Sequence, residues 1–213
     1  MSDEWKADPL QGYWLEFSGE VQDHLHQFCG ENRIPGAVCP ACNKPLLRLL
    51  SLDTRDIRLN LANMRFPFLH LLYCWTCSIP YGLFVYRIHD EGRIELISYE
   101  KNYEGAFGAE GPYDDYPDVF AGQQVGLIPV LPESDPDDLR HQVGGEPMIY
   151  NPAAPIQCSS CSSEMPFLAA ICDDASGDGF LPGHASFVGN PGVQMVFHFC
   201  RNCSMVSAYH SVD

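Results

Sequence analysis

The sequence is short of basic residues. Its 213 residues include 12 lysines and arginines against 28 aspartates and glutamates, which gives a formal net charge of −16 at pH 7. Nucleic-acid binding needs a basic face that neutralises phosphates, so this composition argues against a nucleic-acid partner. An acidic surface is either a solvated exterior or a face that receives a basic protein.

Long apolar runs and targeting signals are missing too. The longest candidate run, residues 66–73, contains Pro67 and His70 and falls short of the roughly 18 residues that span a bilayer. The first residues, MSDEWKADPLQGYWLEF, lack the basic region and apolar core of a signal peptide. We therefore expect a cytoplasmic protein without a membrane partner, in a compartment where thiols stay reduced.

Catalytic motifs are absent as well. The sequence shows no nucleophile–base pairing, phosphate loop or HExxH motif. A non-catalytic role is therefore the leading expectation, and an enzyme or small-ligand binder with a His/Asp pocket is the alternative. The candidate residues for that pocket are His141, His184, His210, Asp173 and Asp174.

Cysteine, by contrast, is abundant and ordered. Eight of the ten cysteines form four CxxC pairs, whereas random placement would give roughly 0.4 such pairs. Two intervening residues let a tight turn direct both sulfurs to one side, and two such knuckles complete a tetrahedron around zinc. The pairs are Cys39–Cys42, Cys74–Cys77, Cys158–Cys161 and Cys200–Cys203.

Four thiolates favour zinc or iron over magnesium or calcium and leave no open position for water. We predict two structural zinc ions per chain, held by sequential pairs. Redox-active CxxC motifs, disulfides and an iron–sulfur cluster are alternatives for the same residues, and crossed pairing would require interlocked halves. The predicted ligand sets are Cys39, Cys42, Cys74 and Cys77, and Cys158, Cys161, Cys200 and Cys203.

Four further residues near these pairs have ordinary interpretations. Cys172 ends an apolar run and is expected in the core, and Cys29 is expected in the core or as a free thiol. His70 and His198 each precede a complete cysteine pair, so both are interpreted as strand residues.

The two halves of the chain share one order: knuckle, strand, acidic turn, insertion, strand, knuckle, strand. This favours a duplication. One short helix is predicted, with Ser18 as its N-cap and Val21, Leu25 and Phe28 along one face. Alternation and β-branched content predict strands at residues 46–52, 69–73, 82–88, 94–99, 166–171, 193–199 and 205–210.

The predicted fold is mostly β, with two four-cysteine zinc ribbons in a β-rich body for which the repeat suggests a duplication. Its parts are a zinc-ribbon half at 1–100, an acidic insertion at 101–139 and a second zinc-ribbon half at 140–213, together forming one unit. Residues 100–138 carry ten acidic side chains against one basic side chain, Lys101, with aromatic residues between them. Such a long loop is either a connector or a docking segment for a basic partner.

The second half also carries a motif, His141-Gln-Val-Gly-Gly-Glu-Pro147, which is followed by Pro155-Ile-Gln-Cys-x-x-Cys and Met165-Pro-Phe-Leu-Ala-Ala-Ile. It resembles the YwqG-like family of uncharacterised proteins, which share H-x-x-G-G-x-P, although Ala170 stands where that family commonly has Gln. The order of motifs is similar to the programmed cell death protein 2 group, which is associated with chaperoning a ribosomal protein. Gly144 and Gly145 read as a turn that needs positive φ.

These observations predict a non-catalytic zinc protein that binds a basic protein client through an acidic surface. The resemblance implies two versions of that role, a chaperone for a ribosomal protein or an immunity protein that neutralises a basic toxin.

Overall fold

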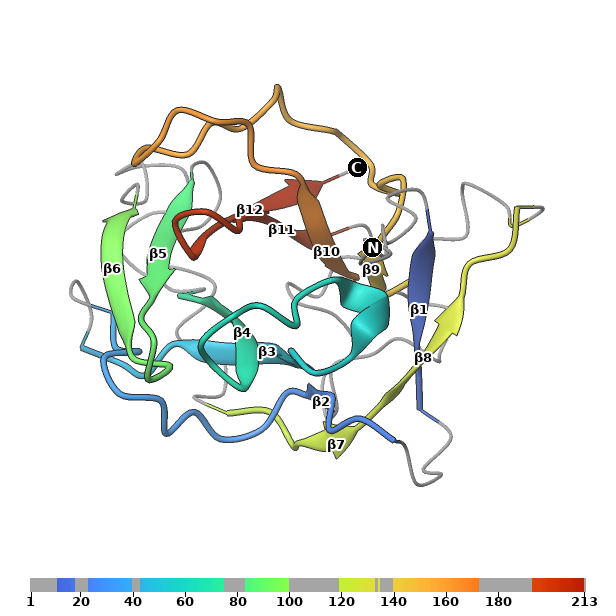
Figure 1. The fold of residues 1–213 in the computed structure, drawn as a ribbon, viewed down its shortest axis with the longest axis horizontal. Helices are drawn as coiled ribbons and strands as arrows, with labels where there is room; N and C mark the ends of the chain where they lie inside the picture. The colour runs from blue at the N-terminus through green and yellow to red at the C-terminus, as the bar shows by residue number, and fades with distance from the viewer. Residues whose placement is uncertain are drawn as a thin grey trace, which may run out of the picture.

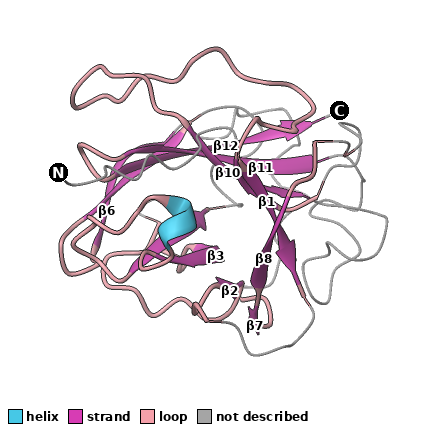
Figure 2. Cartoon of the chain, turned by 45° about the vertical axis from the view of Figure 1, so that its right-hand side comes forward, coloured by secondary structure: helices cyan, strands magenta, loops and turns pink. Residues whose placement is uncertain are grey.

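The described residues form two antiparallel sheets (Figure 1). The computed structural model describes residues 11–17, 23–39, 43–74, 83–99, 119–132, 134, 140–172 and 193–212. All strand pairings between these residues are antiparallel, and Figure 2 shows strands and loops with a single short helical turn. The prediction of a mostly β fold is therefore confirmed.

The larger sheet has eight strands. In spatial order they are β6 (Ile94–Tyr99), β5 (Phe84–Ile88), β12 (Met205–Val212), β11 (Val193–Cys200), β10 (Phe167–Cys172), β9 (Gln142–Gly144), β1 (Gly12–Glu16) and β8 (Gly126–Pro129). These strands come from all three predicted segments of the chain.

The smaller sheet has four strands, and a 3₁₀ turn, η1 (Ile57–Leu59), lies in the connection between two of them. Its strands, in spatial order, are β4 (Phe68–Tyr73), β3 (Leu47–Asp53), β2 (Gln27–Phe28) and β7 (Gln123–Gln124).

The main core lies between the two sheets. Alternate residues of β11 and β12, such as Phe197 and Ala208, point into it with Leu50 and Leu71 of the smaller sheet. Their neighbours in sequence point to the opposite face, since successive strand residues alternate. The Tyr86 hydroxyl ties the sheets together, because it donates to the carbonyl of His70 at 2.7 Å and accepts the amide of Leu72 at 3.0 Å.

A second, smaller core covers the other face of the larger sheet. It contains Val196 and Tyr209 from the strands and Ile156 and Met165 from the segment that precedes β10. The larger sheet is therefore buried on both faces over these strands.

The smaller sheet has a counterpart inside the larger one. The order β4-β3-β2-β7 corresponds to β11-β10-β9-β1, and both β3 and β10 have a register shift at the same place, between Arg48 and Leu50 and between Phe167 and Ala169. One row of paired residues across the smaller sheet is Leu71, Leu50, Phe28 and Gln123; the matching row is Phe197, Ala169, Val143 and Tyr13.

Buried histidines repeat in the same way. Nδ1 of His26 accepts the amide of Asp53 at 3.1 Å, and Nδ1 of His141 accepts the amide of Cys172 at 3.0 Å. The predicted Gly-Gly turn is also confirmed, with φ of 66° at Gly144 and 74° at Gly145, and the matching Cys29 and Gly30 have φ of 52° and 99°. An added Cβ at Gly145 would lie 2.5 Å from the backbone of Gly12.

The seven strands predicted in the sequence are all found, with ends that differ by at most two residues. The helix prediction is wrong where the structure describes it. Leu25 lies before β2 and Phe28 lies within β2, fully buried against the larger sheet, so the spacing of these two apolar residues is not helical in origin. Ser18 and Val21 lie outside the described residues.

Candidate metal centre

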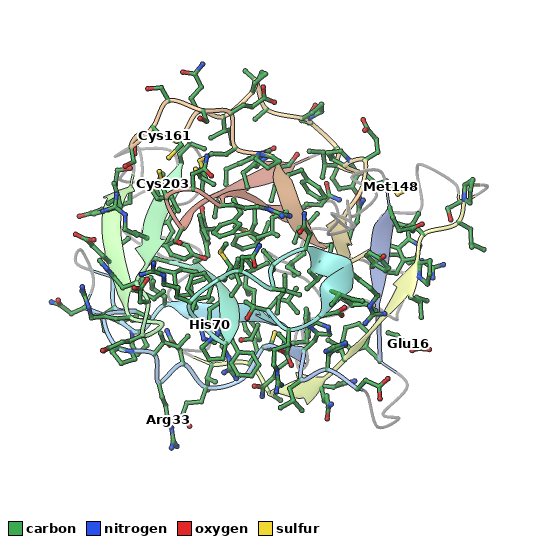
Figure 3. All side chains as sticks on the ribbon, in the orientation of Figure 1. Glu16, Arg33, His70, Met148, Cys161 and Cys203 are labelled. Atoms are coloured by element: carbon green, nitrogen blue, oxygen red, sulfur yellow. The ribbon has the colours of Figure 1, made fainter. Side chains whose placement is uncertain are left out.

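Four cysteines of the second half converge at one end of the larger sheet. The sulfurs of Cys158, Cys161, Cys200 and Cys203 all lie within 4.8 Å of one another. Cys158 and Cys161 belong to the loop before β10, and Cys200 and Cys203 border the turn between β11 and β12. Figure 3 shows Cys161 and Cys203 close together at this end of the molecule. This group can hold a metal ion.

The distance between two of the sulfurs is compatible with tetrahedral coordination of a metal ion by thiolates. A tetrahedron with Zn–S bonds of about 2.3 Å places its sulfurs about 3.8 Å apart, and the sulfurs of Cys161 and Cys200 are 3.7 Å apart. A disulfide bond is much shorter, at about 2.05 Å. No disulfide bond joins any two of the eight cysteines that the structure describes.

Electrostatics divide the four thiols. Hydrogen bonds from the Ser163 hydroxyl and amide, with a smaller one from Cys203, lower the pKa of the exposed Cys161 thiol to about 6. Burial raises the pKa of Cys200 to about 12. Because metal ions bind thiolates, a metal ion at this site would have to displace the proton of Cys200.

The knuckle before β10 is built by backbone hydrogen bonds. The amide of Ser162 donates to the carbonyl of Cys158, and the amide of Cys158 donates to the carbonyl of Ser163, both at 2.8 Å. Ser162 has a φ of 58°, which lets the chain turn back beneath the two sulfurs.

The same hydrogen bonds occur in the first half. The amide of Asn43 donates to the carbonyl of Cys39 at 2.8 Å, the amide of Cys39 donates to the carbonyl of Lys44 at 2.9 Å, and φ of Asn43 is 58°. Cys39 is buried, as is Cys74, which directly follows β4 as Cys200 ends β11. The other two predicted ligands, Cys42 and Cys77, lie outside the described residues.

The knuckle after β11 also contacts the segment that connects β3 and β4 of the smaller sheet. Arg201 lies between Cys200 and Cys203 and donates to the carbonyls of Asn60 at 2.6 Å and Leu59 at 3.2 Å, just at the end of η1. These two hydrogen bonds connect the cysteine cluster to η1.

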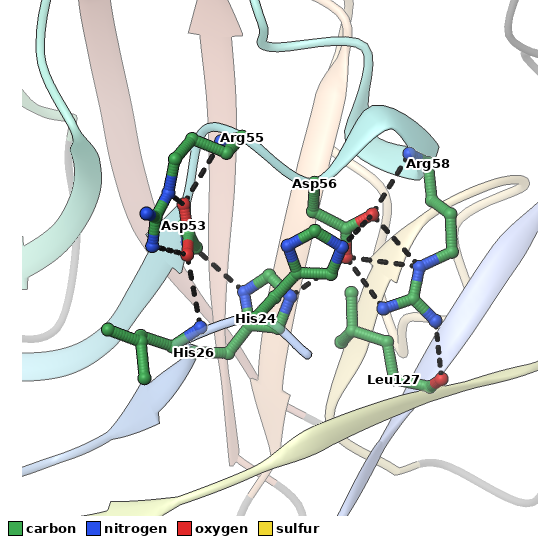
Figure 4. Close-up of polar contacts among 8 residues, drawn as sticks. His24, His26, Asp53, Arg55, Asp56, Arg58 and Leu127 are labelled. Atoms are coloured by element: carbon green, nitrogen blue, oxygen red, sulfur yellow. Dashed lines mark hydrogen bonds and ion pairs between the residues drawn. The ribbon is translucent and has the colours of Figure 1, made fainter. Parts of the chain in front are cut away.

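A buried polar network surrounds the start of η1 (Figure 4). Nε2 of His26 lies 2.9 Å from a carboxylate oxygen of Asp56, to which Arg58 also donates at 2.6 Å. Arg55 donates to both oxygens of the buried Asp53. This network was not predicted from the sequence, although residues 53–58 contain Asp-x-Arg twice in succession.

These contacts fix the charges of the network. Hydrogen bonds from Arg55 hold the pKa of Asp53 well below its usual range. Burial would raise the pKa of Asp56, but hydrogen bonds from His26 and Arg58 outweigh it and bring the pKa well below its usual range. Each carboxylate is neutralised by its arginine, and Nδ1 of His26 is occupied by a backbone amide, so this network stabilises the fold.

The other predicted candidates have these positions. His141 is 2% exposed and packs against Phe28 with 4.7 Å between ring centroids, which is a core position. His210 is on β12, and His184, Asp173 and Asp174 lie outside the described residues. His70 and His198 are strand residues, as predicted, on β4 and β11.

Both remaining cysteines are in the interior. Cys172 is 2% exposed at the end of β10, as predicted, and Cys29 is fully buried. Burial raises the pKa of the Cys29 thiol far above its usual value, so it is not a reactive thiolate.

Charge is unevenly distributed along the chain. The described residues contain ten acidic and ten basic side chains and are neutral overall. The remaining residues contain eighteen acidic and two basic side chains and so carry the whole charge of −16. The described part of the predicted acidic insertion, 119–132, contains β7 and β8 and no charged side chain.

In comparisons with known proteins, no family, curated protein or solved structure matches this chain. The resemblance to the YwqG-like family and the programmed cell death protein 2 group stays a prediction from the motifs of residues 141–171. Among the described residues, no helix has the length and apolar character that a membrane crossing requires.

Proposed function

We propose that this protein is a non-catalytic, cytoplasmic zinc protein that binds a basic protein partner through its acidic segments. Two zinc ions per chain have a structural role. Zinc suits the all-thiolate donor set, and four protein ligands leave no position for a substrate or a reactive water.

The second zinc site is held by Cys39, Cys42, Cys74 and Cys77. It is supported by the repeated hydrogen bonds around Cys39 and Cys158 and by the common position of Cys74 and Cys200 at the ends of β4 and β11. A duplication of the strands and knuckles accounts for all of these correspondences together. Two Zn(Cys)₄ groups would bring the net charge to roughly −20.

The observation that carries the proposed partner class is the separation of charge. The described β framework has no net charge, and eighteen acidic side chains fall in the other segments, ten of them within residues 100–138. Complementary charge of this density accelerates association with a basic protein and excludes acidic ones. A chaperone for a ribosomal protein and an immunity protein against a basic toxin both need such a surface.

The test is affinity purification of the tagged full-length chain from native cells at low and high salt. We expect a basic protein to be recovered at low salt and to be lost at high salt, because exposed charges are screened. Neutralising Glu133, Asp135, Asp137 and Asp138 together should abolish recovery.

The matched control neutralises four exposed acidic residues of the described framework, Asp23, Asp90, Glu91 and Glu164. Both variants lose four negative charges, so only a role for the acidic segment predicts a difference between them. Recovery of no basic protein even at low salt would contradict the proposal.

A further inference from the structure

The two sheets differ on their outer faces, meaning the faces that point away from the main core. On the larger sheet, one row of paired residues is Val196, Ala170, Gln142 and Trp14, and these side chains are at most 5% exposed. The matching row on the smaller sheet is His70, Ser51, Gln27 and Gln124, of which only Ser51 is buried.

The covering segment explains this difference. On the larger sheet, Gln142 accepts the amide of Met148, and Gln194 donates to the carbonyl of Met148, so the segment after β9 is fastened onto the face. Thirteen residues separate Gly144 from Cys158, whereas nine separate the matching Cys29 from Cys39. Among the described residues, the shorter segment does not cover the outer face of the smaller sheet as its counterpart covers the larger one.

Two adjoining cavities of about 340 Å³ and about 460 Å³ lie on this open face. Four residues line both cavities, and we call the combined space the outer groove: Gln27, Arg48, Phe68 and His70. Figure 3 shows His70 at the smaller sheet and Arg33, at the rim of the larger cavity, at the edge of the molecule.

Arg48 brings a half-buried cation into the outer groove. Its Nε donates to the carbonyl of Cys29 at 3.1 Å, and no carboxylate among the described residues forms a close ion pair with its guanidinium, which interacts with Glu31 only at longer range. Arg55 and Arg58, by contrast, each bind a buried aspartate. A half-buried guanidinium that has no close ion-pair partner among the described residues is a binding group for an anion.

The backbone is shaped to admit these side chains. A Cβ at Gly30 would collide with Nη2 of Arg48, and a Cβ at Gly122 would lie 2.9 Å from Nε2 of Gln27. Gly30 has a φ of 99°, so its conformation also favours glycine.

The opposite wall is aromatic. The rings of Phe68 and His70 are stacked, with 6.0 Å between centroids and 28° between planes. Nδ1 of His70 shares a hydrogen bond of 2.8 Å with the Ser51 hydroxyl, which holds the ring in place. Burial and the nearby Arg48 lower the pKa of His70 to about 4, so the ring is neutral at pH 7 and a poor base.

We propose that the outer groove binds a small planar monocarboxylate, with its carboxylate on Arg48 and its flat body against Phe68 and His70. A single charge is favoured because Glu31 and Glu91 also line the larger cavity and would repel a phosphate dianion more strongly than a monoanion. The amides of Gln27 and Gln124 supply polar contacts at the other end. This site is independent of the proposed basic partner.

The test is isothermal titration of the zinc-loaded full chain at pH 7 with three probes: benzoate, benzamide and inorganic phosphate. Benzoate should bind at least about tenfold more tightly than benzamide, because a charge-assisted hydrogen-bond pair is lost with the neutral amide. Phosphate should bind more weakly than benzoate. No binding of benzoate at roughly 10 mM, or phosphate binding tighter than benzoate, overturns the proposal, since millimolar affinity is the least such contacts should give.

Arg48→Gln should weaken benzoate binding at least about tenfold. The control is Arg33→Gln, because Arg33 lines the same groove but is exposed and already paired with Glu31 at 2.7 Å. The benzoate affinity of this variant should stay within about twofold of that of the unaltered protein. An equal loss of benzoate affinity in both variants would show that binding depends on the overall charge of the protein and not on Arg48, and this would overturn the proposed site.

His70→Val introduces the residue that the larger sheet has at the matching position, Val196, and valine is well suited to a strand. This variant tests the aromatic wall if Arg48→Gln fails to fold. It should lower benzoate affinity about threefold or more through the lost ring contact. Unchanged affinity would overturn the assigned wall.

Discussion

The two cysteine-bearing halves have the same local construction but a different surrounding structure. Knuckle, register shift, buried histidine and paired positive-φ residues recur at matching places. The strands that flank the repeated unit in each sheet do not match. β12 pairs with β11, whereas β5 leaves β4 and pairs with β12; β1 completes the second half and β7 completes the first. Local hydrogen bonds thus define the repeated unit, and tertiary packing decides where its outer strands go.

The largest effect should come from removing one ligand from each half. Cys74→Ser and Cys200→Ser should each lower zinc from about two to about one per chain and strongly destabilise the fold, because structural zinc contributes roughly 10–16 kcal/mol in small domains. Elemental analysis and thermal unfolding measure both.

Cys172→Ala is the control, since Cys172 is a buried cysteine outside the clusters and should keep about two zinc ions. If Cys74→Ser still binds two zinc ions, the two halves share their backbone structure but Cys74 is not a zinc ligand. Almost no zinc in the unaltered protein would refute both sites.

The second-largest effect should come from removing a buried carboxylate of the first half. The strand position of Asp53 in β3 is occupied by Cys172 in β10, so the described part of the second half has no carboxylate at the matching position. Asp56→Ala should cost about 3 kcal/mol, because it leaves Arg58 and His26 without their partner in a buried site. Urea unfolding measures the loss.

Asp90→Ala provides the comparison. Asp90 pairs with Arg65 at 3.0 Å, but both side chains are more than two-thirds exposed, so the cost should be below about 1 kcal/mol. Equal costs for the two variants would remove the distinction between a buried network and a surface pair.

Acid should affect the first half through the same carboxylates. The folded pKa values of Asp53 and Asp56 lie below those of the unfolded chain, so their contribution to stability is complete above about pH 4 and is lost as pH falls towards the folded values. The free energy of unfolding should therefore fall on acidification, and should fall less in Asp53→Asn.

Zinc release at low pH lowers stability in both proteins, so the difference between their urea midpoints from about pH 6 to about pH 3 isolates the carboxylate. Parallel curves for the two proteins would show that Asp53 titrates alike in the folded and unfolded states.

The sequence was sufficient for features that depend on local pattern. The seven longer strands, the Gly144–Gly145 turn and the ligand set of the second half follow from alternation, glycine and CxxC spacing. The strands it missed are β1, β2, β7, β8 and β9. Most are two to four residues long, and β7 is two glutamines, so their pairing comes from neighbours far away in the chain.

The sequence also could not predict that β1, from the first half of the chain, pairs with β9 of the second half, while β7, which follows the first half, pairs with β2. Before the sheets pack, either strand could pair with either partner. The Asp53–Asp56 network was missed for another reason. Its sequence looks like an exposed polar turn, and only the position of His26, brought in by β2, shows that the carboxylates are buried.

The smallest effect should come from making one outer-face position of the two sheets alike. Ser51→Ala introduces the residue that β10 has at the matching position, Ala170, and removes the hydrogen bond to His70. Stability should change by less than about 1 kcal/mol, because the His70 ring stays partly exposed and water can replace the hydroxyl. Thermal and urea unfolding measure it. A loss above about 2 kcal/mol would mean that the Ser51–His70 pair supports the small sheet itself, and that the polar outer face is as structural there as Val196 and Ala170 are on the larger sheet.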